Sequence, residues 1–306
     1  MKNLAIGILL LSHGGSAQWN QSVKEVQREV SARFPVEVAF GMADPVEIQG
    51  AVEKLEARGV KKIVAVPLFI SSHSEVIDQT KYVLGMAKAP SKDFMSAPHS
   101  HFMAMGVRRV RARLPLVLAP ALDDSPTAAA ILLDRAREMS RDPSKETVLL
   151  VGHGPLKDSD DRLWLAAMQR LADDVKRRGG FAQARVATLR DDSPPDVQEK
   201  ADRRLREMVN DSSRTTKVLV IPYLISTGGI EAHIQKALDG TFYAWKGRAL
   251  LPDPRIAGWV EQSAAQAGAL PDMRLYKGGA DTYAPADSYA PRTEASDSYA
   301  TPGIGK

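Results

Sequence analysis

Residues 6–14 read IGILLLSHG, and a close copy, TVLLVGHG, occurs in mid-chain at residues 147–154. A second phrase is repeated as well, because KIVAVPLFIS at residues 62–71 returns as KVLVIPYLIS at residues 217–226. Each half of the chain thus has an apolar strand ending in His-Gly and a later apolar strand ending in Pro-x-x-Ile-Ser. Internal similarity of this kind predicts two units of one fold.

Helical and extended patterns alternate between these landmarks. The apolar spacing predicts helices and strands of ordinary length, with Pro or Gly at several of their ends. Strands that alternate with helices predict mostly parallel sheets covered on both faces. The expected fold is α/β, with two similar doubly wound domains. The helices are expected at residues 20–33, 45–58, 76–87, 127–139, 163–175, 195–209 and 230–238.

The repeat also sets the expected domain boundaries. We place the first domain at residues 1–141 and the second at 142–275, with the linker around Asp142-Pro143-Ser144. Residues 276–306 are poor in aliphatic side chains and repeat an Asp-Ser-Tyr-Ala phrase, a composition typical of a disordered tail. The segment from 89 to 115 gives no clear pattern apart from a strand at 114–118.

Composition narrows the chemistry. The 306 residues include no cysteine, which excludes disulfides, thiolate metal sites and cysteine nucleophiles. Any bound metal must therefore be held by His, Asp, Glu or backbone oxygen, ligands that suit Co, Ni, Fe or Zn. The net charge of +4 is spread along the chain without a long basic run, so no nucleic-acid partner is expected.

No apolar stretch is long enough to cross a bilayer, and no membrane association is expected. The apolar run near the N-terminus is interpreted as the first strand because it recurs in mid-chain. A cytoplasmic protein is expected on this reading. The alternative, a short signal peptide, stays open.

Histidines follow the predicted strand ends. His13 ends the first strand, and His73 and Glu75 follow the strand at 63–67. Parallel strands end at one edge of a sheet, where ligands of such folds bind. Two imidazoles and one carboxylate can hold a borderline divalent metal and can also accept protons near neutral pH. The alternative is that His13 caps the next helix and His73 is an ordinary loop residue.

A second, weaker cluster is expected in the other half, from His153, Glu231 and His233. It can contact metal or substrate, or it can be a degenerate copy that only shapes the cleft. His99 and His101 can chelate metal or lie in an exposed loop. Neither a Gly-x-Gly-x-x-Gly phrase after a strand nor a Walker A sequence is present, so no dinucleotide and no ATP are expected.

These residues resemble a known family. The phrase Leu-Leu-x-His-Gly, Asn20 seven residues after His13, the triplet 43–45 (Ala-Asp-Pro) and the phrase Val-Pro-Leu-Phe-Ile-Ser look like the CbiX-type sirohydrochlorin chelatases. The resemblance covers residues 4–260 and both halves, as in the two-domain members. Residues 69–76, FISSHSEV, are also distantly similar to ferrochelatase.

The resemblance implies a class II chelatase, a lyase that needs neither ATP nor a second type of subunit. Such enzymes insert Co²⁺ or Fe²⁺ into sirohydrochlorin on the way to cobalamin or siroheme, and Ni²⁺ is a further candidate. His13 corresponds to the family histidine that binds metal and helps to remove pyrrole protons. Together with the strand-end reasoning, this makes His13 and Glu75 the expected catalytic residues, and His13, His73 and Glu75 the expected metal ligands.

The chain departs from the family pattern in the second loop. The family usually has Pro-Gly-Arg-His there, but Glu75 occupies the position of that histidine and His73 precedes it; in the second half Ile230 stands there. The metal and the tetrapyrrole are therefore left open. The basic residues Arg108, Arg109 and Arg111 are candidate clamps for the substrate's carboxylates.

Other functions remain open at the sequence level. The main alternative is a non-catalytic metal- or tetrapyrrole-binding protein of the same fold, and a further one is an unrelated α/β enzyme. The expected partner is a small tetrapyrrole, and the chain is expected to be a monomer or a homodimer.

Overall fold

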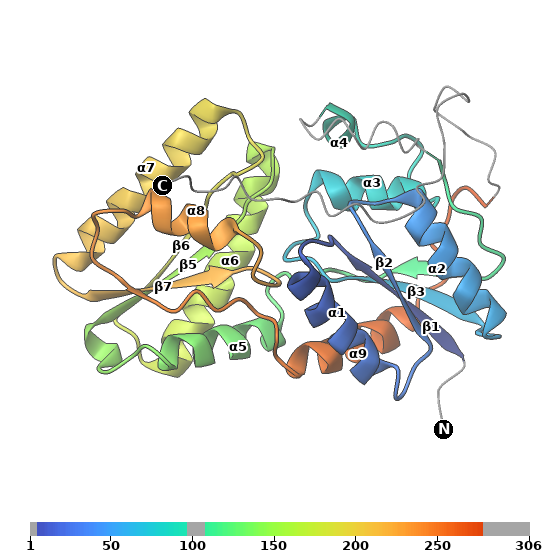
Figure 1. Cartoon of the computed structure of the whole chain (residues 1–306), viewed down its shortest axis with the longest axis horizontal. Coiled ribbons are helices and arrows are strands. Elements are labelled where there is room, and N and C mark those ends of the chain that lie inside the picture. The colour runs from blue at the N-terminus through green and yellow to red at the C-terminus, as the bar shows by residue number, and fades with distance from the viewer. Residues whose placement is uncertain (1–4, 97–107, 278–306) are drawn as a thin grey trace, which may run out of the picture.

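Two four-stranded sheets, one from each half of the chain, lie at the centre of the computed structural model, which describes residues 5–96 and 108–277 (Figure 1). Their strand orders are β2-β1-β3-β4 and β6-β5-β7-β8, and every strand pair is parallel. The second order is the first repeated. The prediction of two similar doubly wound α/β domains is therefore confirmed. The strands are β1 (Ile6–Ser12), β2 (Val36–Phe40), β3 (Lys62–Pro67), β4 (Leu116–Leu118), β5 (Glu146–Gly152), β6 (Gln183–Thr188), β7 (Lys217–Tyr223) and β8 (Ala244–Trp245).

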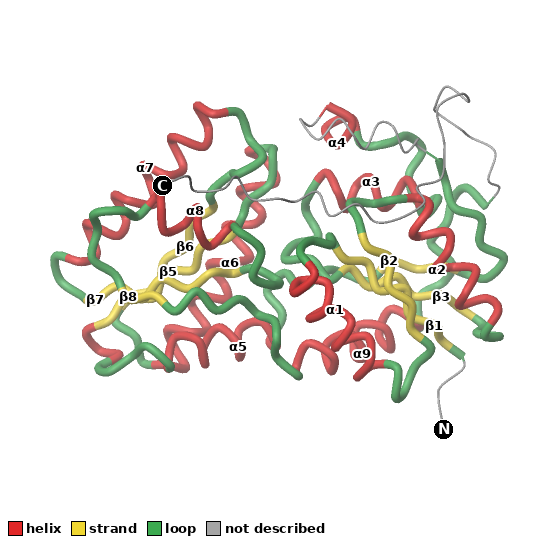
Figure 2. The backbone as a smooth tube through the Cα atoms, in the orientation of Figure 1, coloured by secondary structure: helices red, strands yellow, loops and turns green. Residues whose placement is uncertain are grey.

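Helices cover both faces of each sheet (Figure 2). Several begin where the sequence provides a capping side chain: Ser16 accepts from the Trp19 N–H, and Asp44 accepts from the Val46 N–H. The helices are α1 (Ala17–Val30), α2 (Pro45–Ala57), α3 (Glu75–Val83), α4 (Lys92–Ser96), α5 (Pro126–Arg137), α6 (Asp158–Gly179), α7 (Pro195–Ser213), α8 (Ile230–Ala237) and α9 (Arg255–Gly268), with a short 3₁₀ turn at Pro143–Lys145.

The central strands are buried on both faces. Along β1, Ile8 and Leu10 belong to one apolar cluster, whereas Leu9 and Leu11 belong to another on the opposite face. This alternation is expected for a strand whose side chains point to opposite faces in turn. The first cluster also contains Val148 and Leu150 of β5, so one continuous core joins the two sheets.

Two helices are exchanged between the halves. After β4 the chain crosses over, and α5 packs on α6 and β7 of the second sheet. After β8 it returns, and α9 packs on α1, β1 and β3 of the first sheet, as its position beside α1 in Figure 1 shows. Each spatial unit thus contains one helix from the other half. The division at 1–141 and 142–275 stays a proposal about the sequence repeat.

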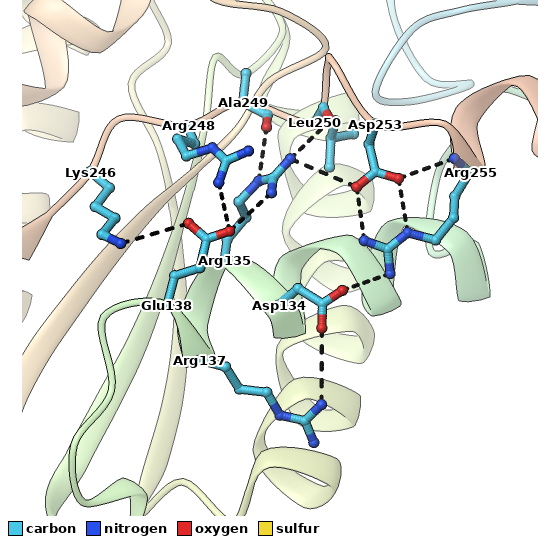
Figure 3. A network of polar contacts seen from close by, with 10 residues as sticks. All are labelled: Asp134, Arg135, Arg137, Glu138, Lys246, Arg248, Ala249, Leu250, Asp253 and Arg255. Carbon is cyan, nitrogen blue, oxygen red and sulfur yellow. Dashed lines mark hydrogen bonds and ion pairs between the residues drawn. The ribbon is translucent and has the colours of Figure 1, made fainter.

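A polar network holds the returning segment (Figure 3). The buried side chain of Arg135 on α5 donates to the carbonyl oxygens of Ala249 at 3.3 Å and Leu250 at 3.4 Å. Its guanidinium also pairs with Glu138 on the same helix at 3.3 Å and with Asp253 at 3.8 Å, just before α9. The network therefore ties the start of α9 to α5.

The segment after α9 returns to the edge of the first sheet. The Met273 N–H donates to the Leu116 carbonyl at 3.0 Å, and the Leu275 N–H donates to the Gly85 carbonyl at 2.9 Å. The Asp272 carboxylate pairs with Arg274, which holds the carboxyl pKa well below its usual range. Residues 272–276 thus cover the edge strand β4, which would otherwise present unpaired backbone groups.

The segment from 89 to 115, which has no clear sequence pattern, contains the short helix α4 and, from residue 108, an extended segment alongside α2. Gln49 on α2 exchanges two hydrogen bonds with the backbone of Arg111. The candidates His99 and His101 lie outside the described residues, as does the predicted tail 276–306 except for its first two residues. In the described part of the chain, no helix is long and apolar enough to cross a membrane.

Candidate functional site at the strand ends

His13 lies directly after β1, at the carboxyl edge of the first sheet. Its side chain is exposed, its Nδ1 lies 2.7 Å from the Gly14 carbonyl oxygen, and its ring meets the Trp19 ring edge-on with centroids 6.5 Å apart. Asn20 fixes the loop, because it accepts from the Gly15 N–H at 2.9 Å and donates to the Gly15 carbonyl at 3.2 Å. The Asn20 of the sequence motif thus shapes the turn that presents His13.

The loop after β3 carries the other two predicted residues. His73 is exposed, and its N–H donates to the Ser71 hydroxyl at 3.1 Å. Ser74 caps α3 by accepting from the Ile77 N–H at 3.3 Å. Glu75, the first residue of α3, is buried.

The surroundings of the Glu75 carboxyl combine burial with nearby charges. Its Oε2 has no hydrogen-bond partner among the described residues. Burial raises the pKa of this carboxyl, and the charges of Asp192 and Asp160 raise it further, while a backbone hydrogen bond and His153 oppose them. All three of these charged neighbours belong to the second half of the chain. The Glu75 carboxyl is therefore influenced by charges of the second half.

The second half presents a matching strand-end histidine. His153 follows β5, and its Nδ1 lies 2.8 Å from the Gly154 carbonyl oxygen, the same contact that His13 makes with Gly14. Its Nε2 lies 3.3 Å from Asp192 Oδ2. Asp192 was not predicted from the sequence, although it follows the carboxyl end of β6 just as Asp44 follows that of β2.

The other two candidates of the second half have structural contacts. Glu231 is buried, and its Oε2 accepts from the N–H groups of Gly228 at 3.2 Å and Gly229 at 3.1 Å at the start of α8. His233 has a carboxylate on each ring nitrogen, Asp191 at Nδ1 and Asp202 at Nε2. Both nitrogens of His233 are thus occupied by carboxylates rather than directed at a ligand.

The three predicted clamps are in different environments. Arg108 and Arg111 are exposed, whereas Arg109 is 5% exposed. The Arg109 guanidinium lies between the rings of Tyr82 at 4.6 Å and Tyr276 at 4.1 Å, and it donates to the carbonyls of Ala87 and Lys88. Arg109 thus holds the covering segment 272–276 in place. The clamp role stays a prediction for Arg108 and Arg111.

The predicted metal ligands are not drawn together into a closed cage. Within residues 5–96 and 108–277, no group of three or more His, Asp or Glu side chains is arranged to hold a metal ion. The structure instead places two exposed imidazoles, His13 and His73, at one sheet edge, and the charges that act on Glu75 include His153 and Asp192 of the second half. The ligand set His13, His73 and Glu75 stays a prediction.

A sequence profile of the CbiX family matches residues 7–139 and 147–267, which is one match for each half of the repeat. The chain belongs to the CbiX family. No curated relative matches it. The strand-end histidines of the two halves are thus set within two CbiX repeats.

Solved structures of similar fold include two of the sirohydrochlorin chelatase SirB from Bacillus subtilis. The one with Fe³⁺ is 16% identical over 88% of this chain and 96% of its own, with a TM-score of 0.58. The one with cobalt is 14% identical over 89% and 100%, with a TM-score of 0.56. DR2241 from Deinococcus radiodurans, a multi-domain protein described as similar to chelatases, is 20% identical over 92% of this chain and 57% of its own, with a TM-score of 0.53.

Proposed function

We propose that this CbiX-family protein inserts a divalent metal ion into sirohydrochlorin or a related tetrapyrrole without ATP. The observation that carries the proposal is the exposed His13 at the carboxyl end of β1, within a loop shaped by Asn20, in a chain that matches the family over both repeats. The SirB structures with Fe³⁺ and cobalt support Fe²⁺ and Co²⁺ as the metal substrates, and Ni²⁺ is the third candidate.

The chemistry requires a group that accepts protons and ligands that release the ion. Metal insertion removes two pyrrole protons and strips water from the ion. An exposed imidazole such as His13 can bind a borderline metal weakly and accept a proton near neutral pH. His73 lies at the same sheet edge and is exposed, so it is the second proposed ligand.

Glu75 is proposed as the third participant. A buried carboxyl with a raised pKa and an unpartnered oxygen is poised to take a proton or to accept a cation. Arg108 and Arg111 are exposed cations suited to the carboxylates of the macrocycle. We further propose a cytoplasmic monomer or homodimer that acts in cobalamin or siroheme synthesis.

The test is anaerobic incubation of the full chain with an excess of sirohydrochlorin and Co²⁺, Fe²⁺ or Ni²⁺ in turn, followed by visible spectroscopy. Repeated turnover is expected, and His13→Ala should lose it. His233→Gln is the matched control, because this histidine is engaged by two carboxylates. A spectrum that changes only in proportion to the protein would indicate a non-catalytic tetrapyrrole- or metal-binding protein and would overturn the proposal.

A further inference from the structure

The second half of the chain contacts the His73 loop through one tryptophan. Trp164 lies on α6, and its indole Nε1–H donates to the carbonyl oxygen of His73 at 2.5 Å. The Trp164 side chain is only 8% exposed. The bond joins residues 91 positions apart in the chain, so it links the halves rather than neighbouring segments.

The first half makes the corresponding contact in the opposite direction. A Cβ atom added to Gly228 would lie 3.3 Å from Cδ1 of Trp19, so the Trp19 indole packs against the loop after β7. In the repeat, Ile70-Ser71-Ser72-His73 corresponds to Ile225-Ser226-Thr227-Gly228. His73 and Gly228 are therefore equivalent positions, and each contacts a tryptophan on the first helix of the opposite half.

The contact bears on the proposed metal ligand through its backbone. The part of the chain that the structure describes makes no hydrogen bond to the His73 ring, so the ring's direction depends on how the loop is held. Ser72 is held by Asp123 and Ser74 caps α3. The hydrogen bond from Trp164 fixes the peptide group that joins His73 to Ser74, and its donor belongs to the second half.

We propose that Trp164 is a positioning residue through which the second half orients the loop that carries His73 and Glu75. This inference rests on the proposed function, because it assumes that the His73 loop meets the metal substrate. The proposal also assigns a structural role to the second repeat. Gly228 occupies the position of His73 there, so the second half has no counterpart of the His73 imidazole and instead supports the loop that carries it.

The test compares Trp164→Phe with Trp259→Phe in the full chain. Both replacements remove a buried indole from the same apolar cluster, since Trp259 on α9 is 7% exposed. Of these two tryptophans, Trp164 alone donates a hydrogen bond to the His73 loop in the described part of the chain. The measurements are the Kd for Co²⁺ by calorimetry, the KM for Co²⁺ and for sirohydrochlorin, and amide hydrogen exchange of residues 71–75.

Trp164→Phe should raise the Kd and KM for Co²⁺ by about fivefold, the equilibrium equivalent of one neutral hydrogen bond, with kcat less affected. The KM for sirohydrochlorin should change less, exchange in residues 71–75 should speed up, and Trp259→Phe should leave all of these near wild type. Equal effects of the two variants, or unchanged exchange in the loop, would overturn the proposal.

A second measurement keeps the proposal testable if Trp164→Phe does not fold. In the wild-type chain, the indole proton of Trp164 should exchange slowly and more slowly still after Co²⁺ is added. Fast exchange would overturn the proposal. A wild-type chain that shows protected loop amides but neither binds Co²⁺ nor turns over would refute the proposed function while leaving the tryptophan contact intact.

Discussion

The carboxylate of Asp123 accepts two hydrogen bonds from Ser72. Oδ1 accepts from the Ser72 N–H at 2.7 Å, and Oδ2 accepts from the Ser72 hydroxyl at 2.6 Å. Asp123 lies where the chain crosses from β4 to α5, and its φ of 42° is in the left-handed region. Its own carbonyl oxygen accepts from the Tyr223 hydroxyl at 2.5 Å. One residue thus connects the His73 loop, the crossover and the second sheet.

Asp123→Ala should destabilise the protein by about 2–3 kcal/mol, because it removes two charge-assisted hydrogen bonds and puts a strained left-handed alanine in their place. Asp123→Asn should cost roughly half as much, since Asn tolerates this backbone conformation and keeps one acceptor. Urea denaturation followed by circular dichroism measures both. If Ala and Asn were equally destabilising, the backbone conformation would not contribute.

Glu75→Gln should separate stability from activity. Burial, followed by the nearby Asp192 and Asp160, raises the pKa of Glu75 above its ordinary value of 4.5, so the folded protein holds this proton more tightly than the unfolded chain does. The ionised carboxylate therefore costs stability as the pH rises above that value, and the neutral amide removes this cost.

The variant should consequently unfold at a higher urea concentration than wild type near neutral pH, and the difference should disappear on acidification below the ordinary carboxyl value. Metal insertion should fall at the same time, because the amide can neither take up a proton nor carry charge. A variant that is less stable than wild type at neutral pH would show that Glu75 is stabilised as a carboxylate.

Arg135 and Arg137 lie on the same helix but should behave very differently (Figure 3). Arg135 is buried and donates to two carbonyls, so Arg135→Leu leaves those carbonyls and part of the Glu138 and Asp253 charge unpaired. A loss of about 3 kcal/mol is expected. The Arg137 side chain is 57% exposed and pairs with Asp134 at 3.9 Å, so Arg137→Leu should cost under about 0.5 kcal/mol.

Thermal and urea unfolding of the two variants would measure the difference in stability between Arg135→Leu and Arg137→Leu. If Arg135 holds the start of α9, Arg135→Leu should also make the unfolding of the two halves less cooperative, because α9 packs on the first sheet. Similar midpoints for Arg135→Leu and Arg137→Leu would show that the buried network contributes little.

The fold could be predicted largely because the decisive strands repeat. The strands β1 and β5 contain continuous apolar runs without a polar face, so the sequence identifies them as buried strands, and each is followed by His-Gly. The exchange of α5 and α9 could not be predicted, because an apolar helix face indicates burial but not which sheet it covers. The sequence pattern predicts that α3 continues to Ala87, but the helix ends at Val83, because Gly85 with a φ of 77° terminates it.

The parts of the candidate site that could be predicted are the residues whose position in the fold follows from where a strand ends. His13, His73 and His153 lie at strand ends, as the sequence indicates. The partners that govern their chemistry come from distant segments, and sequence spacing carries no signal for them. Trp164 meets His73 across the two halves, and Tyr276 covers Arg109 from beyond α9. One signal was available, since Trp19 and Trp164 both lie on the helix that follows a His-Gly pair.

We expect the ionisation of His233 to make the stability of the protein vary with pH. Burial lowers the pKa of this imidazole, but Asp202 and Asp191 outweigh burial and raise the pKa above its ordinary value of 6.5. The two carboxylates come from α7 and from the segment after β6, and Glu231 lies on the same helix as His233. The charged imidazole therefore joins three segments of the second half, and its contribution is fully present below the ordinary value and lost as the pH rises through the raised one.

His233→Gln should thus be clearly less stable than wild type at about pH 6 and close to it at about pH 9, as urea midpoints would show. Asp202→Asn removes one of the two carboxylates and should reduce the same difference. Because both ring nitrogens are occupied, metal insertion at neutral pH should change little in His233→Gln, in contrast to His13→Ala. A stability gap that is the same at both pH values would mean that His233 acts through its shape and neutral hydrogen bonds rather than through its charge.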